Sequence, residues 1–384
     1  MSVKVFRGRL VLADGMMEDG MVITEGDQIR YVGEPIHVES PEEEITSSGY
    51  IWPGLIDLHV HGAGGADVMD GTPQALQRIS HTLASYGVTG FLATTVTMDK
   101  PHLEKALANV SDTSSSLTGA RTLGVHLEGP WICPAKRGAQ NPEYIQDPQP
   151  TDADWAMEAS RGKLRLVTMA PERSGAAALI ENLHRQGVVV SAGHTSASFE
   201  QLMSAVEAGV SHITHVFNGM TGLHHREPGV AGAAMADDRV TVEVIGDGLH
   251  VHPAVIRLLC RTKPEDGLIL ISDGMRAVGQ PDGVYDLGGL AVTAQQGKAT
   301  LEDGSLAGSL LTLDQAVRNT ADYADIPLWK AVRMASLAPA KRLGLADELG
   351  SLQAGKRADL SLTDERGHIL RVFSGGREIA SARE

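Results

Sequence analysis

The chain has 384 residues, 42% of them hydrophobic, and a formal net charge of −15 at pH 7, which suits a large barrel with a minor second domain and a sizeable core. The acidic balance argues against binding to nucleic acid or to anionic membranes, because both require clustered lysine and arginine. No apolar run approaches the roughly 18 residues of a membrane span, and the N-terminus lacks the apolar stretch of a secretory signal, so we expect a cytoplasmic protein without a membrane partner.

The N-terminal segment, residues 1–52, has the pattern of short β-strands. Apolar or alternating stretches are separated by turn-forming residues such as Asp-Gly and Gly-Glu-Pro, and they lie at 4–11, 21–24 and 29–32. These stretches alone offer too little apolar surface for a stable domain, so we expect them to pair with strands from elsewhere in the chain.

From residue 53 to residue 344 the pattern changes to strands alternating with helices. Eight short, nearly continuous apolar runs are typical of strands in a parallel sheet covered by helices, and they lie at 55–60, 90–96, 123–127, 164–169, 188–192, 213–217, 242–245 and 268–271. Helical periodicity separates many of them, at 73–86, 102–110, 176–186, 199–207 and 253–261. Eight strands are the number that closes a (β/α)8 barrel, so we predict an α/β fold with a TIM-type catalytic barrel over 53–344.

The C-terminal segment, residues 345–384, returns to the pattern of the N-terminus. Short strands are predicted at 360–363, 369–373 and 378–379, with Gly375 and Gly376 as a hairpin turn. We therefore predict that 1–52 and 345–384 pair into one small β-sandwich domain, which brings the two ends of the chain together.

Residues that can bind metal ions lie in or just after five of the eight apolar runs. They are His59, His61, Glu128, His194, His215 and Asp273. In a barrel the carboxyl ends of all strands face one side, so these side chains are expected to converge there. His59 and His61 are two apart on a strand and therefore point to the same side. Imidazole and carboxylate ligands suit zinc and related divalent ions, and the thiolates of a closed structural zinc site are absent.

Other polar residues near these motifs receive different interpretations. Lone histidines are expected to be structural hydrogen-bonding residues, namely His81, His102, His184 and His212. Asp57 either supports the ligands from behind or caps a turn. Cys133 lies close to the Glu128 motif, but no Cys-His signature supports it as a nucleophile. The two cysteines, Cys133 and Cys260, suit a reducing compartment.

Several of these motifs resemble a known group of enzymes. The segment PGLIDLHVHG at 53–62, the late Asp273 and the segment at 350–360 resemble the amidohydrolase superfamily. Within it, the chain resembles the N-acetylglucosamine-6-phosphate deacetylases in HLEGPW at 126–131, GAQNP at 138–142, SAGHT at 191–195, THVFNGM at 214–220, GDGLHVHP at 246–253 and GSLAGS at 304–309. The resemblance covers the whole chain, and the combination of HLEGP with THVFN is highly specific.

The resemblance implies a role for each motif residue. Glu128, His194 and His215 would hold the principal ion, and Asp273 would be the general base and acid. Some members carry Gln and Asn in place of His59 and His61; because both are histidine here, one or two ions per subunit are expected, zinc before iron, manganese or cobalt. Substrate contacts are implied for Gln140, Asn218, Gly219, Arg226, His250, Leu306, Ala307 and Gly308. Members commonly form homodimers in which the residue matching Arg226 reaches the substrate phosphate of the neighbouring subunit.

Two of the implied substrate residues depart from the common pattern. Gln140 replaces a histidine that contacts the acetyl carbonyl in some members, and a glutamine amide can also donate that hydrogen bond. Gly219 replaces a usual alanine, which matters little because that contact is made by the backbone.

The activity that follows from the resemblance is metal-dependent deacetylation of N-acetyl-D-glucosamine 6-phosphate, a step of amino-sugar catabolism or of the recycling of cell-wall sugars. Two alternatives stay open: the same reaction on the galactosamine epimer, and a non-catalytic binding protein on an amidohydrolase-like barrel. Dihydroorotases and hydantoinases use a lysine on the fourth strand, and the segment 164–169 has none.

Overall fold

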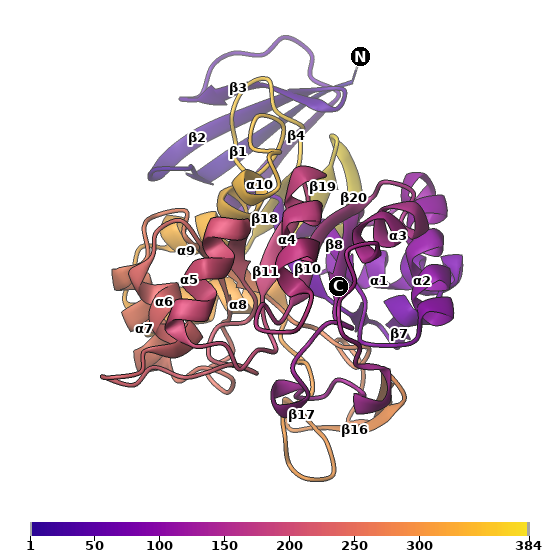
Figure 1. The fold of residues 1–384 in the computed structure, drawn as a ribbon. Helices are drawn as coiled ribbons and strands as arrows, with labels where there is room; N and C mark the ends of the chain where they lie inside the picture. Colours follow the sequence, from indigo (N-terminus) through magenta and orange to yellow (C-terminus); the bar gives the residue numbers. More distant parts are fainter. Residues whose placement is uncertain (1, 382–384) are drawn as a thin grey trace.

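The structure is a computed structural model, and it describes residues 2–381. Eight parallel strands form the central sheet, as predicted (Figure 1). Each strand pairs with the next one along the chain, in the order β5 (Leu55–Val60), β8 (Val88–Thr94), β9 (Arg121–Glu128), β10 (Leu164–Met169), β11 (Val189–Ala192), β12 (Val210–Ile213), β13 (Thr241–Ile245) and β14 (Leu268–Ile271). Every residue of β5, β8 and β14 is buried, which explains their largely apolar sequences.

Backbone hydrogen bonds join the first and last strands of this sheet near their carboxyl ends. Val60 and Gly274 form a parallel bridge. The amide of Asp273 donates to the carbonyl of His59 at 2.9 Å, and the amide of His61 donates to the carbonyl of Gly274 at 2.9 Å. The sheet is therefore a (β/α)8 barrel that closes beside the predicted ligands, and the predicted fold class is confirmed.

Helices surround the barrel. They are α1 (Pro73–Ala84), α2 (Lys100–Thr113), α3 (Asp152–Ala159), α4 (Ala176–Arg185), α5 (Phe199–Ala208), α6 (Gly229–Ala236), α7 (Pro253–Thr262), α8 (Leu313–Ala324), α9 (Leu328–Met334) and α10 (Leu337–Arg342). Sequence-encoded caps fix several starts: Thr72 accepts a hydrogen bond from the amide of Ala75 before Pro73, and Ser198 forms a capping box with Gln201.

Short elements complete the barrel. The 3-10 helices are η1 (Val68–Asp70), η2 (Ser114–Ser116), η3 (Pro134–Lys136) and η4 (Pro142–Tyr144). Strands β6 (Gly62–Ala63) and β7 (Ala66–Asp67) form a small hairpin after β5. A separate antiparallel sheet follows β14 and contains β15 (Gly283–Leu287), β16 (Leu290–Gln295) and β17 (Lys298–Thr300). In Figure 1 this sheet lies at the opposite end of the barrel from the terminal domain.

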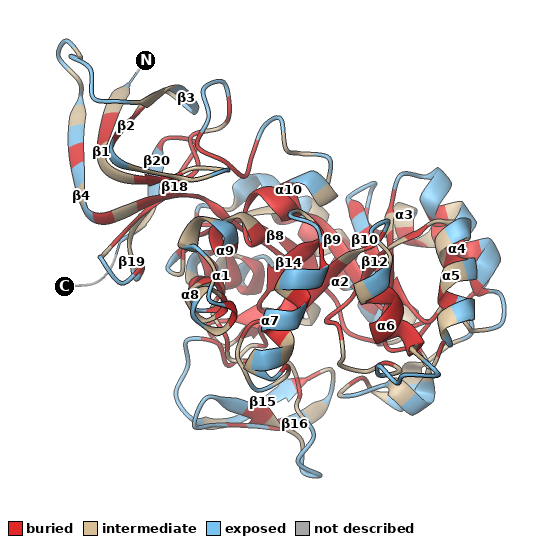
Figure 2. Ribbon diagram, turned by 90° about the vertical axis from the view of Figure 1, so that its left-hand side faces the viewer, coloured by how far each residue is buried: buried red, intermediate tan, exposed pale blue. Residues whose placement is uncertain are grey.

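Both ends of the chain contribute to one seven-stranded sheet, so the predicted pairing of the termini is also confirmed (Figure 2). Its order is β20 (Arg377–Ser381), β19 (Ile369–Ser374), β18 (Leu360–Thr363), β4 (Glu43–Pro53), β1 (Val3–Val11), β2 (Met16–Glu25) and β3 (Gln28–Gly33). Phe6 in β1 and Phe373 in β19 are not on neighbouring strands, yet their rings contact edge to face at 4.9 Å. The sheet therefore curls around a core of its own.

The sixth predicted barrel strand was misplaced. The apolar run at 213–217 predicted a strand, but β12 ends at Ile213. His215 and Phe217 have positive φ angles of 26° and 75°, which a strand cannot contain. The chain therefore leaves the sheet at the point where it enters the candidate site.

Some elements had no clear signal in the sequence. Helix α6 has the sequence GVAGAAMA and is buried on nearly all sides, so it lacks the polar face that reveals a helix. Strand β4, helices α3, α8, α9 and α10, and the sheet β15–β17 were also not predicted. Within 2–381, no helix combines the length and the apolar character needed to cross a membrane.

Candidate metal centre

The predicted ligands converge on the carboxyl end of the barrel. His59 and His61 come from β5 and the residue after it, and Glu128 is the last residue of β9. His194, His215 and Asp273 each lie two residues beyond the end of a strand. All three of these residues have positive φ angles, 47°, 26° and 50° respectively, a conformation that is uncommon outside glycine and often found at functional sites.

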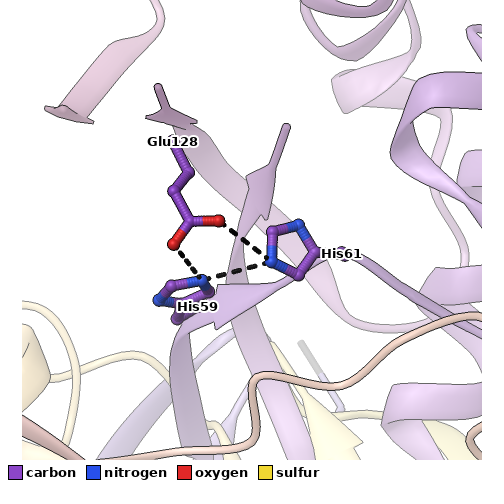
Figure 3. Close-up of side chains that lie close together, drawn as sticks. All are labelled: His59, His61 and Glu128. Carbon is purple, nitrogen blue, oxygen red and sulfur yellow. Dashed lines mark hydrogen bonds and ion pairs between the residues drawn. The ribbon is translucent and has the colours of Figure 1, made fainter. Parts of the chain in front are cut away.

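Two groups of possible ligands share Glu128. The His59 cluster contains His59, His61 and Glu128 (Figure 3), and the His194 cluster contains Glu128, His194 and His215. In the His59 cluster the two Nε2 atoms are 3.3 Å apart, and each lies 3.4 Å from an oxygen of Glu128. In the His194 cluster the Nε2 atoms lie 3.2 Å from each other and from Oε1 of Glu128.

These spacings fit divalent ions. Zinc–nitrogen distances of about 2.0–2.1 Å and a tetrahedral angle put two ligand nitrogens about 3.3 Å apart. The ligands are imidazole nitrogens and carboxylate oxygens, which zinc and related ions accept. Both clusters can therefore hold an ion, with Glu128 between them.

The second ring nitrogen of most of these histidines already has a partner. Nδ1 of His194 lies 2.9 Å from the carbonyl of Lys136, and Nδ1 of His61 lies 3.3 Å from the carbonyl of Thr94. Nδ1 of His59 lies 3.1 Å from Oε2 of Glu243. A proton on Nδ1 satisfies these acceptors and leaves the lone electron pair of Nε2 free to bind a metal ion. This arrangement is common among metal-binding histidines.

The electrostatics of the site favour cations. Burial alone would raise the pKa of the Glu128 and Asp273 carboxyls, but the surrounding histidines, His59 above all, outweigh it and lower both values. Burial alone would lower the pKa of His61, but hydrogen bonds to Asp273 and Glu128 raise it to about 9. The carboxylates are thus ionised at neutral pH, and the site binds positive charge in a buried setting.

A cavity of about 290 Å³ opens directly over the clusters. Most of the predicted site residues line it: His61, Glu128, Gln140, His194, His215, Asn218, Gly219, His250, Asp273, Leu306 and Gly308. Oδ1 of Asp273 lies 3.3 Å from Nε2 of His61 and 3.4 Å from Nε2 of His59, so it faces both the cavity and the His59 cluster.

Three predicted residues do not line this cavity. His59 is fully buried beneath it. Ala307 is also fully buried and packs in the apolar cluster under the sheet β15–β17. Arg226 is exposed and lines a separate hollow together with Lys136, Ser196, Thr221 and His224, among others.

Other residues with a clear place in the site escaped the sequence reasoning. Glu243 in β13 is fully buried against His59, and it is the single acidic residue of an apolar strand, which was a usable signal. Leu287 reaches the cavity wall from β15, and nothing in the sequence pointed to it. Asp57, for which the sequence left two roles open, accepts hydrogen bonds from the amides of His59 and Ser272, so it links β5 to the segment after β14.

Two other buried histidines, His212 and His126, belong to neither cluster. His212 lies 3.0 Å from Oε1 of Glu243 and 2.5 Å from Oγ1 of Thr241, as expected for a structural hydrogen-bonding residue. His126 is fully buried under His59 and lies 2.8 Å from Oγ1 of Thr168. These side chains form a polar layer inside the barrel, below the ligands.

A (β/α)8 barrel with two buried imidazole–carboxylate clusters and a cavity above them defines a metal-dependent hydrolase of the TIM-barrel class. Comparison with known proteins agrees, since the model of the amidohydrolase family matches residues 50–379. The chain belongs to the amidohydrolase family.

Relatives and solved structures lie close to this chain over nearly its whole length. The N-acetylglucosamine-6-phosphate deacetylase of Bacillus subtilis is 38% identical, covering 94% of this chain and 96% of the relative. The N-acetylgalactosamine-6-phosphate deacetylase of Escherichia coli O157:H7 is 39% identical, covering 97% and 98%. A mutant N-acetyl-D-glucosamine-6-phosphate deacetylase of Mycobacterium smegmatis, solved with N-acetyl-D-glucosamine 6-phosphate, has a TM-score of 0.94 and 33% identity, covering 99% and 100%.

Proposed function

We propose that this protein hydrolyses N-acetyl-D-glucosamine 6-phosphate to D-glucosamine 6-phosphate and acetate, as a cytoplasmic zinc-dependent homodimer. The observation that carries this proposal is the cavity over the two ligand clusters, with Asp273 facing it and the Asn218–Gly219 segment on its wall. Two relatives named for this reaction match 94% and 96% of the chain. Both cysteines are free, which suits the reducing cytoplasm.

The reaction needs a strong nucleophile, a stabilised oxyanion and a proton for the leaving nitrogen. A divalent cation in these clusters would supply Lewis acidity, which polarises a carbonyl and lowers the pKa of water to about 7. Asp273 is the residue placed to move protons: its ionised carboxylate can accept one from water and then deliver it to the departing amine. Without that proton the nitrogen would have to leave as a strongly basic anion. Asp273 alone can serve both steps, because it delivers to the nitrogen the proton that it accepted from water.

Two further residues can donate hydrogen bonds to the acetyl oxygen. Gln140 uses one Nε2 hydrogen for Glu128, and its second hydrogen remains free. Nδ1 of His250 lies 2.6 Å from Oδ2 of Asp247, which leaves Nε2 for a ligand. Donors of this kind stabilise a developing oxyanion by about 2.7–4 kcal/mol each in comparable sites.

The phosphate group requires a cation that this cavity does not contain. Among the described residues that line it, none is lysine or arginine. Arg226 is exposed, lines a separate hollow, and could bind phosphate through two parallel hydrogen bonds. We therefore propose that Arg226 of one subunit contacts the phosphate bound by the other, which makes the homodimer part of the site.

The galactosamine epimer is the second candidate substrate. It is favoured by one specific observation, the 39% identity to the Escherichia coli O157:H7 relative, which is close to the 38% identity to the Bacillus subtilis relative. Both substrates would use the same clusters and the same Asp273, so the choice concerns the stereochemistry at a single sugar hydroxyl.

One experiment tests the proposal. Acetate release is measured with N-acetylglucosamine 6-phosphate, N-acetylgalactosamine 6-phosphate and unphosphorylated N-acetylglucosamine, before and after removal of metal by a chelator and again after addition of zinc. We expect the first substrate to give the highest kcat/KM, with loss of activity on chelation and recovery with zinc. Higher kcat/KM for the galactosamine compound would establish the second candidate, and full activity of metal-free protein would exclude the mechanism.

A further inference from the structure

Glu243 occupies an unusual position for a carboxylate. It lies in β13, is fully buried, and belongs to neither ligand cluster. Its Oε2 lies 3.1 Å from Nδ1 of His59 and accepts a hydrogen bond from the backbone amide of His215 at 3.3 Å. Its Oε1 lies 3.0 Å from Nε2 of His212. One side chain thus contacts a candidate ligand in β5 and the backbone of another just beyond the end of β12.

A fully buried carboxylate is costly unless a positive charge or strong hydrogen bonds compensate it. Within residues 2–381 no lysine or arginine forms an ion pair with Glu243. Burial lowers the pKa of His212 below its usual value, so that histidine is a neutral partner. The compensating charge must therefore come through His59, either as a proton or as a cation bound at Nε2.

The balance of positive and negative charge in the site indicates a role for Glu243. Two divalent cations bring four positive charges, and Glu128 and Asp273 together bring only two negative ones. Glu243 adds a further negative charge beside His59, which would offset part of the remainder. Because Glu243 acts through the ring of His59, its charge serves the His59 cluster more than the His194 cluster.

We propose that Glu243 is a positioning residue that orients His59 and allows the His59 cluster to retain a second ion. This inference rests on the proposed metal centre and not on the identity of the sugar. The carboxylate holds the proton of His59 on Nδ1, keeps Nε2 free, and balances part of the charge of the ion. The charge and position of Glu243 thus favour the binding of two ions over the binding of one.

The variant Glu243→Gln isolates the charge. The amide oxygen can take the place of Oε2, where it accepts from His59 and from the amide of His215, while the amide nitrogen faces Nε2 of His212. His212 can accept that hydrogen bond because its Nδ1 can donate to Oγ1 of Thr241. Shape and hydrogen bonds are therefore preserved, and only the negative charge is lost.

The test measures zinc binding, independently of activity. Metal-free protein is titrated with zinc against a chromogenic chelator, and the bound metal is counted by mass spectrometry. We expect wild type to bind two ions, and Glu243→Gln to bind the second ion 10- to 100-fold more weakly, the usual scale for a residue that supports a ligand. The affinity of the first ion should change less than threefold. Glu243→Leu, which also removes the hydrogen bonds, should retain one ion.

Two controls separate this role from a structural one. Asp152→Asn neutralises another buried carboxylate, which pairs with Lys100 at 2.8 Å outside the metal centre, and it should leave both affinities unchanged. In a His59→Gln background, Glu243→Gln should have no further effect on the remaining ion, because its route through His59 is gone.

Unchanged affinity for both ions in Glu243→Gln would overturn the inference. It would also be overturned if Glu243→Gln lowered zinc affinity in the His59→Gln background as much as it does with His59 present, because the effect would then act through the amide of His215. A wild-type protein that saturates with one ion would also overturn it. That last outcome would leave the deacetylase proposal standing, since the acetate assay tests it separately.

Discussion

Nε2 of Gln140 donates a hydrogen bond to Oε2 of Glu128 at 2.6 Å. The orientation of the amide is fixed from its other side, because Oε1 of Gln140 accepts from the backbone amide of Thr97 at 2.7 Å. Gln140 therefore restrains the one carboxylate that both clusters share, in addition to lining the cavity. The sequence suggested only the second of these roles.

This contact predicts an effect on metal binding as well as on catalysis. Gln140→Ala removes a hydrogen bond to a charged group, worth about 1.5–3 kcal/mol, so we expect zinc affinity and kcat/KM each to fall by about 10-fold or more. Gln140→His is the matched control and should keep most of the activity, since histidine can also donate. Wild-type zinc affinity in Gln140→Ala would show that Glu128 needs no such restraint.

Replacement of Asp273 by Asn tests the proton-transfer step. Asparagine keeps the size of the side chain but cannot accept the proton, so kcat should fall by at least about 10²–10⁴. The ion of the His194 cluster should remain, because Glu128, His194 and His215 are unchanged. Metal content and kcat are measured on the same sample. A rate within threefold of wild type would assign proton transfer to another residue.

The double variant His59→Gln with His61→Asn tests whether the second ion is essential. It removes both imidazole ligands of the His59 cluster and leaves the His194 cluster complete. We expect a folded enzyme with one ion per subunit and measurable acetate release. Circular dichroism and metal analysis provide the controls for folding and stoichiometry, and an inactive but folded protein would show that catalysis requires both ions.

The proposed role of Arg226 predicts a selective loss. Arg226→Ala should lower kcat/KM for the phosphorylated sugar by 10-fold or more, which corresponds to losing roughly 1.5–3 kcal/mol of charged hydrogen bonding. Turnover of the unphosphorylated sugar should hardly change. The oligomeric state is measured in parallel by light scattering. An equal loss with both sugars would mean that Arg226 supports the fold or the dimer and does not contact the phosphate.

His250 offers a prediction about pH. Burial alone would lower the pKa of its imidazole, but the hydrogen bond and charge of Asp247 outweigh burial and raise it. In Asp247→Asn the charge is gone and burial remains, so the pKa of His250 should fall and less of it should be protonated at neutral pH. Histidine NMR titration of the two proteins measures this directly, with the exposed His252 as an internal reference. An unchanged or higher value would contradict the assignment of Asp247 as its partner.

The fold was predictable from the sequence where buried strands appear as short apolar runs. Strands β10 and β14 were placed at their observed limits because both are short apolar runs between polar segments. The run at 213–217 also predicted a strand, but its backbone turns into the site with positive φ angles, and the side-chain pattern carries no information about that. Helix α6 was not predicted for a different reason. It is buried on nearly all sides, so its sequence lacks the alternation of polar and apolar positions that reveals a helix.

The site was predictable where strand ends bring residues together. His59, His194 and His215 follow from the geometry of any barrel, so their sequence separation did not matter. The wall formed by Leu287 depends on how the sheet β15–β17 folds back over the barrel, which no local pattern encodes. In the proposed homodimer, the place of Arg226 relative to the phosphate depends on a second chain, and the sequence of one chain does not determine it.

The terminal sheet has a consequence for the newly made chain. Strand β4 pairs with β18, which is synthesised about 300 residues later. At a translation rate of about 5–20 residues per second, β4 remains without this partner for roughly 15–60 s while the rest of the chain is synthesised. Phe6 remains without its partner Phe373 for somewhat longer, because the two residues are further apart in the sequence. The part of the protein that is translated first is therefore completed last, and during this interval its apolar surface is available to chaperones and to other nascent chains.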